Sequence, residues 1–228
     1  MVRKQQSWMQ LFPVTWWIIL VTSFVSVLVF ILQYFYPALW TFVALKPIAI
    51  LQGKYLWTLL THMFVHAGFL HLLVNMFALF SLGSLCERII GRKRFFWLYL
   101  LSGIFAGGLS AVLSGFFGTS ALGARIFGSP NIYMVGASGA LFAVAGLFVI
   151  LLPKIRFSLI FLPFFSLPAY IMVPLLLALM WIATIFADLP IGNVAHFGGF
   201  LIGSLYGVYL RMTYRRKVEM LDRYFSRM

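Results

Sequence analysis

The tetrapeptide Gly136-Ala137-Ser138-Gly139 stands where a polar segment, residues 128–131, gives way to an apolar run that ends at Leu152. A small hydroxyl residue between two glycines at the start of an apolar helix either permits close packing or acts as a nucleophile. Clusters of Gly, Ala and Ser are common where helices meet in lipid, because they let two backbones approach each other. The tetrapeptide by itself leaves both interpretations open, and packing is the simpler one.

The composition places the chain in a membrane. Of its 228 residues, 63% are hydrophobic and 9% are charged, whereas charged residues make up about a quarter of a typical soluble domain. No Ser/Pro-rich linker or charged low-complexity tract divides the sequence, so we expect a single domain over residues 1–228. The one cysteine, Cys86, excludes an intrachain disulfide and a multi-cysteine metal site.

Long apolar runs predict an all-α polytopic membrane protein, a bundle of six transmembrane helices. About 20 apolar residues cross a hydrocarbon core. The candidate spans cover residues 14–36, 66–90, 95–117, 135–152, 169–187 and 193–210, and a basic tail follows at 211–228. Residues 37–60 are broken by Pro, Gly and Lys, which suits an interfacial loop. The first run follows Arg3 and Lys4 as a signal peptide would, but no small-residue cleavage site comes after it, so we interpret it as a retained span.

The basic residues predict the orientation. A net charge of +13 could indicate a nucleic-acid partner, but the Lys and Arg residues stand in short clusters between the apolar runs, as a membrane surface requires. If the N-terminus is cytoplasmic, all of the 17 Lys and Arg residues except Lys46, Lys54 and Arg125 lie on the inner side. We therefore expect a multi-pass protein with both termini in the cytoplasm, in a prokaryotic plasma membrane, with no nucleic-acid partner.

Four polar residues fall at one depth within three of the predicted spans. At 1.5 Å per helical residue, Ser138, His196, Asn75 and His71 lie about 20 to 25 Å from the basic residues that end their spans. Polar side chains inside a membrane are costly and are candidates for function by default. Independent packing residues would have no reason to share a depth, so the coincidence favours a site.

The chemistry of these residues suggests their roles. A serine hydroxyl needs a base to accept its proton, and His196 is the leading candidate for that base at the depth of Ser138. His71 and Asn75 are four residues apart and share one helix face, which suits donors to a developing oxyanion. The backbone N–H groups at the start of the helix of Ser138 also favour negative charge.

Other titratable residues limit the alternatives. His62 and His66, near the outer surface, could compete as bases but fit better as hydrogen-bonded supports of a loop. His71 with His196 could suggest a metal, but carboxylate or thiolate ligands to complete a site are missing, so we expect no metal and no cofactor. The sequence contains only four acids, all at or beyond the predicted membrane boundaries: Glu87, Asp188, Glu219 and Asp222. The chain therefore offers a Ser-His dyad rather than a triad.

Three motifs in order resemble the rhomboid family of intramembrane serine proteases. They are His66-x4-His71-x3-Asn75, Gly136-Ala137-Ser138-Gly139 and Ala195-His196-Phe197-Gly198-Gly199. The resemblance covers residues 12–212 and implies that Ser138 is the nucleophile and His196 the general base. It also implies that His71, Asn75 and the Ser138 backbone N–H form the oxyanion site, with Gly136 and Gly139 in support. The face carrying Gly199, Gly203 and Gly207 is similar to the family's packing of the sixth helix against the fourth.

The chain departs from the family pattern at two positions. Many rhomboids carry a tyrosine one turn after the serine, where this chain has Phe142, which keeps the ring but not the hydroxyl. The Trp-Arg pair of the first external loop appears here as Trp57-Thr58, so an anchoring arginine is missing. Glu87 matches a family acid at the inner end of the second span, and we expect it to be structural.

The resemblance implies a serine-type endopeptidase that cuts membrane-protein substrates in or near their transmembrane helices, within the lipid bilayer. A helix hides its carbonyls in hydrogen bonds, so the substrate must unwind locally. Lateral entry beside the fifth span is expected, and Pro163, Pro168 and Pro174 make that region less regular. The alternatives are a non-catalytic rhomboid-like protein that binds transmembrane helices and, more distantly, a small transporter, although the inverted repeats of transporters are not seen.

Overall fold

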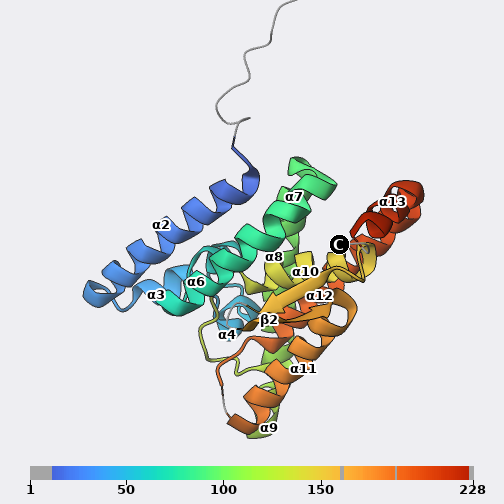
Figure 1. Cartoon of the computed structure of the whole chain (residues 1–228). Coiled ribbons are helices and arrows are strands. Elements are labelled where there is room, and N and C mark those ends of the chain that lie inside the picture. The colour runs from blue at the N-terminus through green and yellow to red at the C-terminus, as the bar shows by residue number, and fades with distance from the viewer. Residues whose placement is uncertain (1–11, 160–161, 188, 226–228) are drawn as a thin grey trace, which may run out of the picture.

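The chain forms a bundle of helices with one short hairpin (Figure 1). The computed structural model describes residues 12–159, 162–187 and 189–225, so Arg3, Lys4, Asp188 and Arg227, which the predictions above use, lie outside the described residues. The helices of the bundle are α2 (Val14–Phe35), α8 (Arg92–Phe117), α10 (Ser138–Leu151), α11 (Ala169–Ala187), α12 (Asn193–Thr213) and α13 (Arg215–Phe225). A further continuous helical segment consists of α6 (Phe69–Ala78), the π-helical η2 (Leu79–Gly83) and α7 (Ser84–Ile90). The connecting elements are α3 (Leu39–Val43), α4 (Pro47–Leu51), α5 (Thr58–Thr61), η1 (His62–Phe64), α9 (Ala121–Phe127), β1 (Arg156–Leu159) and β2 (Leu162–Pro168).

Within the described ranges, four helical segments are long and apolar enough to cross a membrane, which supports a multi-pass membrane protein. They are Val14–Phe35, Phe69–Ile90, Arg92–Phe117 and Ala169–Ala187. α10 is apolar but has only 14 residues, and α12 is not among the four, so six crossings and the side of the termini stay predictions. The second span begins at Phe69 rather than at His66, because the extended Gly68 precedes the helix.

The segment after α10 corrects the all-α prediction. β1 and β2 pair as an antiparallel hairpin, with Arg156 opposite Pro168 and Ser158 opposite Ser166. A proline in a helix interior removes a hydrogen bond and clashes with the preceding turn, and this segment contains two, at positions 163 and 168. The run of aromatic and proline residues therefore continues as strands before α11 begins.

Glycines bring α10 and α12 together at the centre of the bundle, with α2 at one edge and α11 at another (Figure 1). A Cβ atom on Gly199 would overlap the carbonyl oxygen of Gly139, and one on Gly203 would overlap that of Ala143. A Cβ atom on Gly207 would lie 2.8 Å from Cβ of Ile150. This packing confirms the predicted contact between the glycine face of the sixth span and the fourth span.

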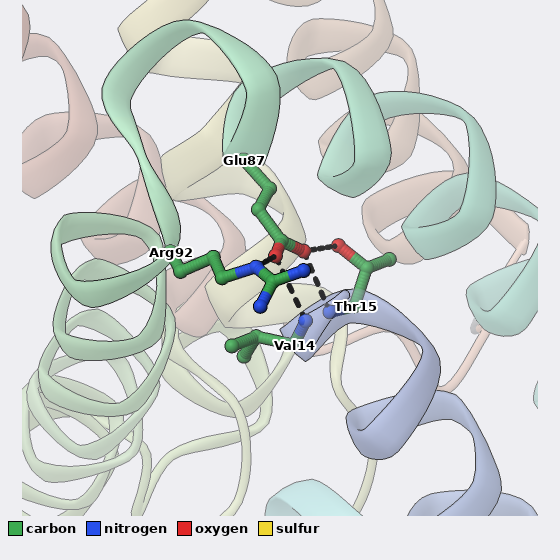
Figure 2. Close-up of polar contacts among 4 residues, drawn as sticks. All are labelled: Val14, Thr15, Glu87 and Arg92. Carbon is green, nitrogen blue, oxygen red and sulfur yellow. Dashed lines mark hydrogen bonds and ion pairs between the residues drawn. The ribbon is translucent and has the colours of Figure 1, made fainter. Parts of the chain in front are cut away.

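Glu87, in the first turn of α7, joins this helix to the beginning of α2 (Figure 2). Its carboxylate accepts hydrogen bonds from the backbone N–H groups of Val14 and Thr15, each at 2.8 Å, and from Thr15 Oγ1 at 2.7 Å. Arg92 Nε lies 3.5 Å from the same carboxylate. The first N–H groups of a helix have no partner within the helix, and Glu87 satisfies two of them. The expected structural role of this acid is confirmed.

Side-chain and backbone hydrogen bonds anchor the loop between α2 and α6. Thr58, which stands where the family motif has arginine, is buried, and its hydroxyl donates to the carbonyl of Tyr55 at 2.7 Å. Trp57 Nε1 donates to the carbonyl of Phe42 at 2.9 Å. Leu45 exchanges two backbone hydrogen bonds with Met134, at 3.0 and 2.7 Å. The loop is thereby attached to the segment that leads into the tetrapeptide at residues 136–139.

Candidate active site

Ser138 and His196 come together from two helices. Ser138 is the first residue of α10, and His196 lies in the first turn of α12. Ser138 Oγ lies 2.7 Å from His196 Nε2, although 58 residues separate the two in the sequence. When the hydroxyl donates this hydrogen bond, Nε2 carries no proton and is able to act as a base. The close packing of α10 on α12 therefore produces the arrangement that nucleophilic catalysis requires.

Phe142 holds the imidazole from one side. Its ring stacks on that of His196, with 4.6 Å between the centroids and 28° between the planes. Phe142 lies one helical turn after Ser138, so one helix presents both the serine and the ring that stacks on His196. The predicted ring platform is present without a hydroxyl group.

In the part of the chain that the structure describes, no carboxylate pairs with the second ring nitrogen of His196. Among the described residues, His196 Nδ1 is buried and has no hydrogen-bond partner. Asn193, three residues earlier on α12, donates through Nδ2 to Thr184 Oγ1 at 2.8 Å, and its own Oδ1 is also unpartnered. Within the described residues, the serine is thus the hydrogen-bond partner of the His196 ring, through Nε2, and a catalytic role for this pair stays a prediction.

Gly136 lets His71 approach Ser138. Its φ is +122°, a backbone conformation that residues with side chains rarely adopt. A Cβ atom at this position would lie 2.9 Å from Cε1 of His71 and 3.8 Å from Oγ of Ser138. The imidazole of His71 therefore occupies space that any side chain at position 136 would need, next to the serine.

Asn75 lies one turn after His71 on α6. Its Nδ2 donates to the carbonyl of His71 at 2.8 Å, and its side chain is buried. An amide nitrogen carries two protons, so one N–H remains beyond this bond. The predicted pair of oxyanion donors thus shares one helix face beside Ser138.

One cavity of about 790 Å³ contains all of these groups. Its lining includes the four predicted polar residues of the site, Ser138, His196, His71 and Asn75. From there it continues along α10 between the helices of the second span and α11, as far as β1. This volume lies within the range of about 300 to 1,000 Å³ that is usual for ligand sites. Among the residues that the structure describes, no group of three or more His, Cys, Asp or Glu side chains could hold a metal ion.

His62 supports the backbone before the serine. Its Nδ1 lies 2.9 Å from the carbonyl of Thr58, and its own carbonyl accepts a hydrogen bond from the N–H of Gly136 at 2.9 Å. The side chain is buried. The prediction that His62 supports a loop is confirmed.

His66 also supports the backbone before the serine, and its own partner, Ser26, was not predicted from the sequence. His66 Nδ1 lies 3.0 Å from Oγ of Ser26, and the N–H of Ala137 points to its Nε2 at 3.5 Å. Ser26 shares a buried face of α2 with Thr15 and Thr22. Three hydroxyl residues on one face of an otherwise apolar span are a signal that could have indicated this contact.

Comparisons with known proteins point to one family. Residues 53–213 match the family model described as the rhomboid domain. The chain is 32% identical over 199 residues to rhomboid protein 1, mitochondrial, of Saccharomyces cerevisiae, covering 83% of this chain and 53% of the yeast protein. It is 28% identical to the rhomboid protease GlpG of Haemophilus influenzae, covering 68% of this chain and 70% of that protein. The human presenilin-associated rhomboid-like protein, mitochondrial, is 29% identical, with 64% of this chain and 36% of that protein covered. The chain thus spans about half the length of the yeast relative.

Proposed function

This chain belongs to the rhomboid family, and we propose that it is an intramembrane serine protease, a serine-type endopeptidase. Ser138 is the nucleophile, and His196 is the general base. The observation that carries the proposal is the separation of 2.7 Å between Ser138 Oγ and His196 Nε2 inside the cavity.

The proposed reaction follows from the positions of these two residues. His196 Nε2 takes the proton of the Ser138 hydroxyl while Oγ attacks the carbonyl carbon of the scissile peptide bond. The backbone N–H of Ser138 belongs to the first turn of α10, where N–H groups have no partner within the helix. As the C–N bond breaks, the leaving amine takes the proton from His196, and an acyl-enzyme ester remains on Oγ. Water, deprotonated by His196, then hydrolyses the ester and restores the serine.

The oxyanion of the tetrahedral intermediate has three candidate donors. They are the backbone N–H of Ser138, the imidazole of His71 and the remaining N–H of Asn75, and both side chains line the cavity. Donors aimed at the charge that develops in the transition state are usually the largest single contribution to such catalysis. Gly136 contributes indirectly, because its missing side chain leaves room for His71.

The proposed substrates are transmembrane segments of other proteins. The cavity extends along the helix axes between the second span, Phe69–Ile90, and α11. Both of these helical segments are strongly apolar. A helix must expose a carbonyl to be cut, so a segment that unwinds easily near Ser138 is favoured. Lateral entry between α6–α7 and α11 fits this cavity. The relatives include mitochondrial and bacterial proteins, so family membership is compatible with more than one membrane, and a prokaryotic plasma membrane stays a prediction.

The alternative function is binding of transmembrane helices without cleavage. A protein that only binds helices does not need a base beside the serine. Here Ser138 Oγ and His196 Nε2 lie within hydrogen-bonding distance. The test compares purified wild-type protein with Ser138→Ala and His196→Ala on a generic transmembrane substrate in lipid vesicles. Both variants should lose cleavage, and a fluorophosphonate probe should label the wild type at Ser138. Undiminished cleavage by either variant would remove the dyad assignment.

A further inference from the structure

The hairpin after α10 forms the far end of the catalytic cavity. Arg156, Phe157 and Ser158 of β1 line it together with Ser138 and His196, whereas no described residue of β2 does. Phe157 packs edge-on against Phe148 of α10, with 6.0 Å between ring centroids. β1 is thus the strand that faces the cavity, and α10 holds it in place.

The pairing pattern leaves the cavity-facing edge of β1 open. Ile155 directly precedes β1, and Ala169 directly follows β2. The N–H of Ala169 donates to the carbonyl of Ile155 at 2.8 Å, so these two residues form a hydrogen-bonded pair next to the hairpin. Antiparallel ladders alternate between hydrogen-bonded and non-hydrogen-bonded pairs. Phe157 and Leu167 therefore form a hydrogen-bonded pair, whereas the backbone groups of Arg156 and Ser158 point away from β2.

The opposite edge of the hairpin is already occupied. Ser166 stands across from Ser158, so its carbonyl points outward from β2. The guanidinium of Arg156 donates to this carbonyl through Nη2 at 2.5 Å and to Ser166 Oγ from Nε at 2.9 Å. In the described part of the chain, no element outside the hairpin makes a backbone hydrogen bond to Arg156 or Ser158. One edge is capped by a side chain, and the edge facing the cavity is not.

We propose that this open edge of β1 binds an unwound stretch of the substrate by strand addition. The inference rests on the proposed protease function and specifies how the substrate is held beyond the cut. The occupant is the part of the substrate's transmembrane segment between the scissile bond and the end of the bundle at which α10 ends. Its backbone groups lose their helical partners when the segment unwinds, and unpaired backbone groups are costly at membrane depth. An exposed strand edge supplies such partners in known modes of peptide recognition.

The length of α10 fixes which substrate residues reach β1. The 14 residues of α10 extend about 20 Å at 1.5 Å per residue. An extended chain covers this distance in about six residues at 3.3 Å each. Substrate residues about five to nine positions from the cut should therefore pair with β1.

Two serines at opposite edges provide a matched pair of variants. Ser158→Pro removes an N–H from the cavity edge, and Ser166→Pro removes one from the capped edge, each at a position outside the ladder of the hairpin. The quantity to measure is a ratio of two kcat/KM values. The first is for a transmembrane substrate, and the second is for a short peptide substrate that is cut at the same bond but is too short to reach β1. Ser158→Pro should lower this ratio about three- to tenfold, as expected for one lost hydrogen bond, and Ser166→Pro should leave it unchanged. Equal ratios for the two variants would overturn the proposal.

A second experiment leaves the protein unaltered. Synthetic transmembrane substrates with a single backbone ester, which lacks one N–H, are made at each position from five to nine residues beyond the cut. Strand addition predicts slower cleavage at alternate positions, because only every second residue of an added strand faces β1. A uniform response across these positions would contradict it. Cleavage that persists in Ser138→Ala would instead refute the protease assignment, so the two failures are distinguishable.

Discussion

Gly199 of α12 lies so close to Gly139 of α10 that a Cβ atom on Gly199 would overlap the carbonyl oxygen of Gly139. Gly139 follows the serine, and Gly199 is three residues from His196. The contact therefore sets the distance between Ser138 and His196, and a methyl group there must move one helix relative to the other.

Gly199→Ala should lower kcat by about ten- to 100-fold, because a displacement of about 1 Å is enough to misalign a reacting pair. Gly108→Ala is the control, since a Cβ atom there would meet only Leu59, at an ordinary 3.9 Å. Steady-state kinetics in vesicles would measure both. Wild-type kcat for Gly199→Ala would show that the glycine contact does not position the dyad.

Phe142→Leu should lower kcat about three- to tenfold, because the stacked ring that orients His196 is removed and such contacts contribute about 0.5 to 1.5 kcal/mol. Phe142→Tyr keeps the ring and should retain most of the activity. Measuring kcat for both variants compares the loss of the aromatic ring with its retention. Similar losses in both would mean that orientation of the imidazole does not depend on this ring.

Asn75→Ala should reduce kcat by about ten- to 1,000-fold with little change in KM, as expected for the loss of one oxyanion donor among several. The split between kcat and KM matters here because a donor to the transition state does not contribute to ground-state binding. A rise in KM at constant kcat would instead assign Asn75 to substrate binding.

Ser26→Ala should destabilise the protein by about 1 to 3 kcal/mol, because it leaves Nδ1 of the buried His66 without its partner. It should also lower kcat, since His66 lies against the N–H of Ala137, next to the nucleophile. Thr22→Val is a matched control on the same helix face, because Thr22 Oγ1 is buried without a hydrogen-bond partner among the described residues. Unfolding midpoints and kcat should be measured together, and equal behaviour of the two variants would refute the predicted support.

Glu87→Ala should lower the free energy of unfolding by about 3 kcal/mol, because two backbone N–H groups of α2 and the side chain of Thr15 lose a charged acceptor. Glu219→Ala serves as the control. Arg215 donates a hydrogen bond to Glu219 and lowers its pKa, but this pair lies on the exposed surface of α13, where ion pairs add little. Thermal unfolding in detergent should therefore distinguish the two acids, and equal midpoints would contradict the role given to Glu87.

The site was more predictable from the sequence than the hairpin. Ser138, His196, His71 and Asn75 stand out because polar residues are rare in apolar spans, and their depths can be counted from the basic residues that end each span. The glycine face of α12 was equally visible, since its spacing of four residues repeats along one side of a helix.

Two features escaped prediction for physical reasons. An apolar segment rich in aromatic residues has no clear helical or strand period, so β1 and β2 could not be distinguished from an irregular lead-in to α11. The contact of Ser26 with His66 joins residues 40 positions apart. A single serine within a span usually bonds to its own helix. The shared face of Ser26 with Thr15 and Thr22 indicates a tertiary contact but does not identify His66 as the partner.

α2 is held at one end by Glu87 and contacts His66 through Ser26 farther along its length. Most of its remaining surface faces outward. The tilt of such a helix responds to the mismatch between its hydrophobic length and the thickness of the bilayer. A change in membrane thickness that tilts α2 about its fixed end would move Ser26 against His66, so the lipid composition around the first helix would act on the support of the nucleophile.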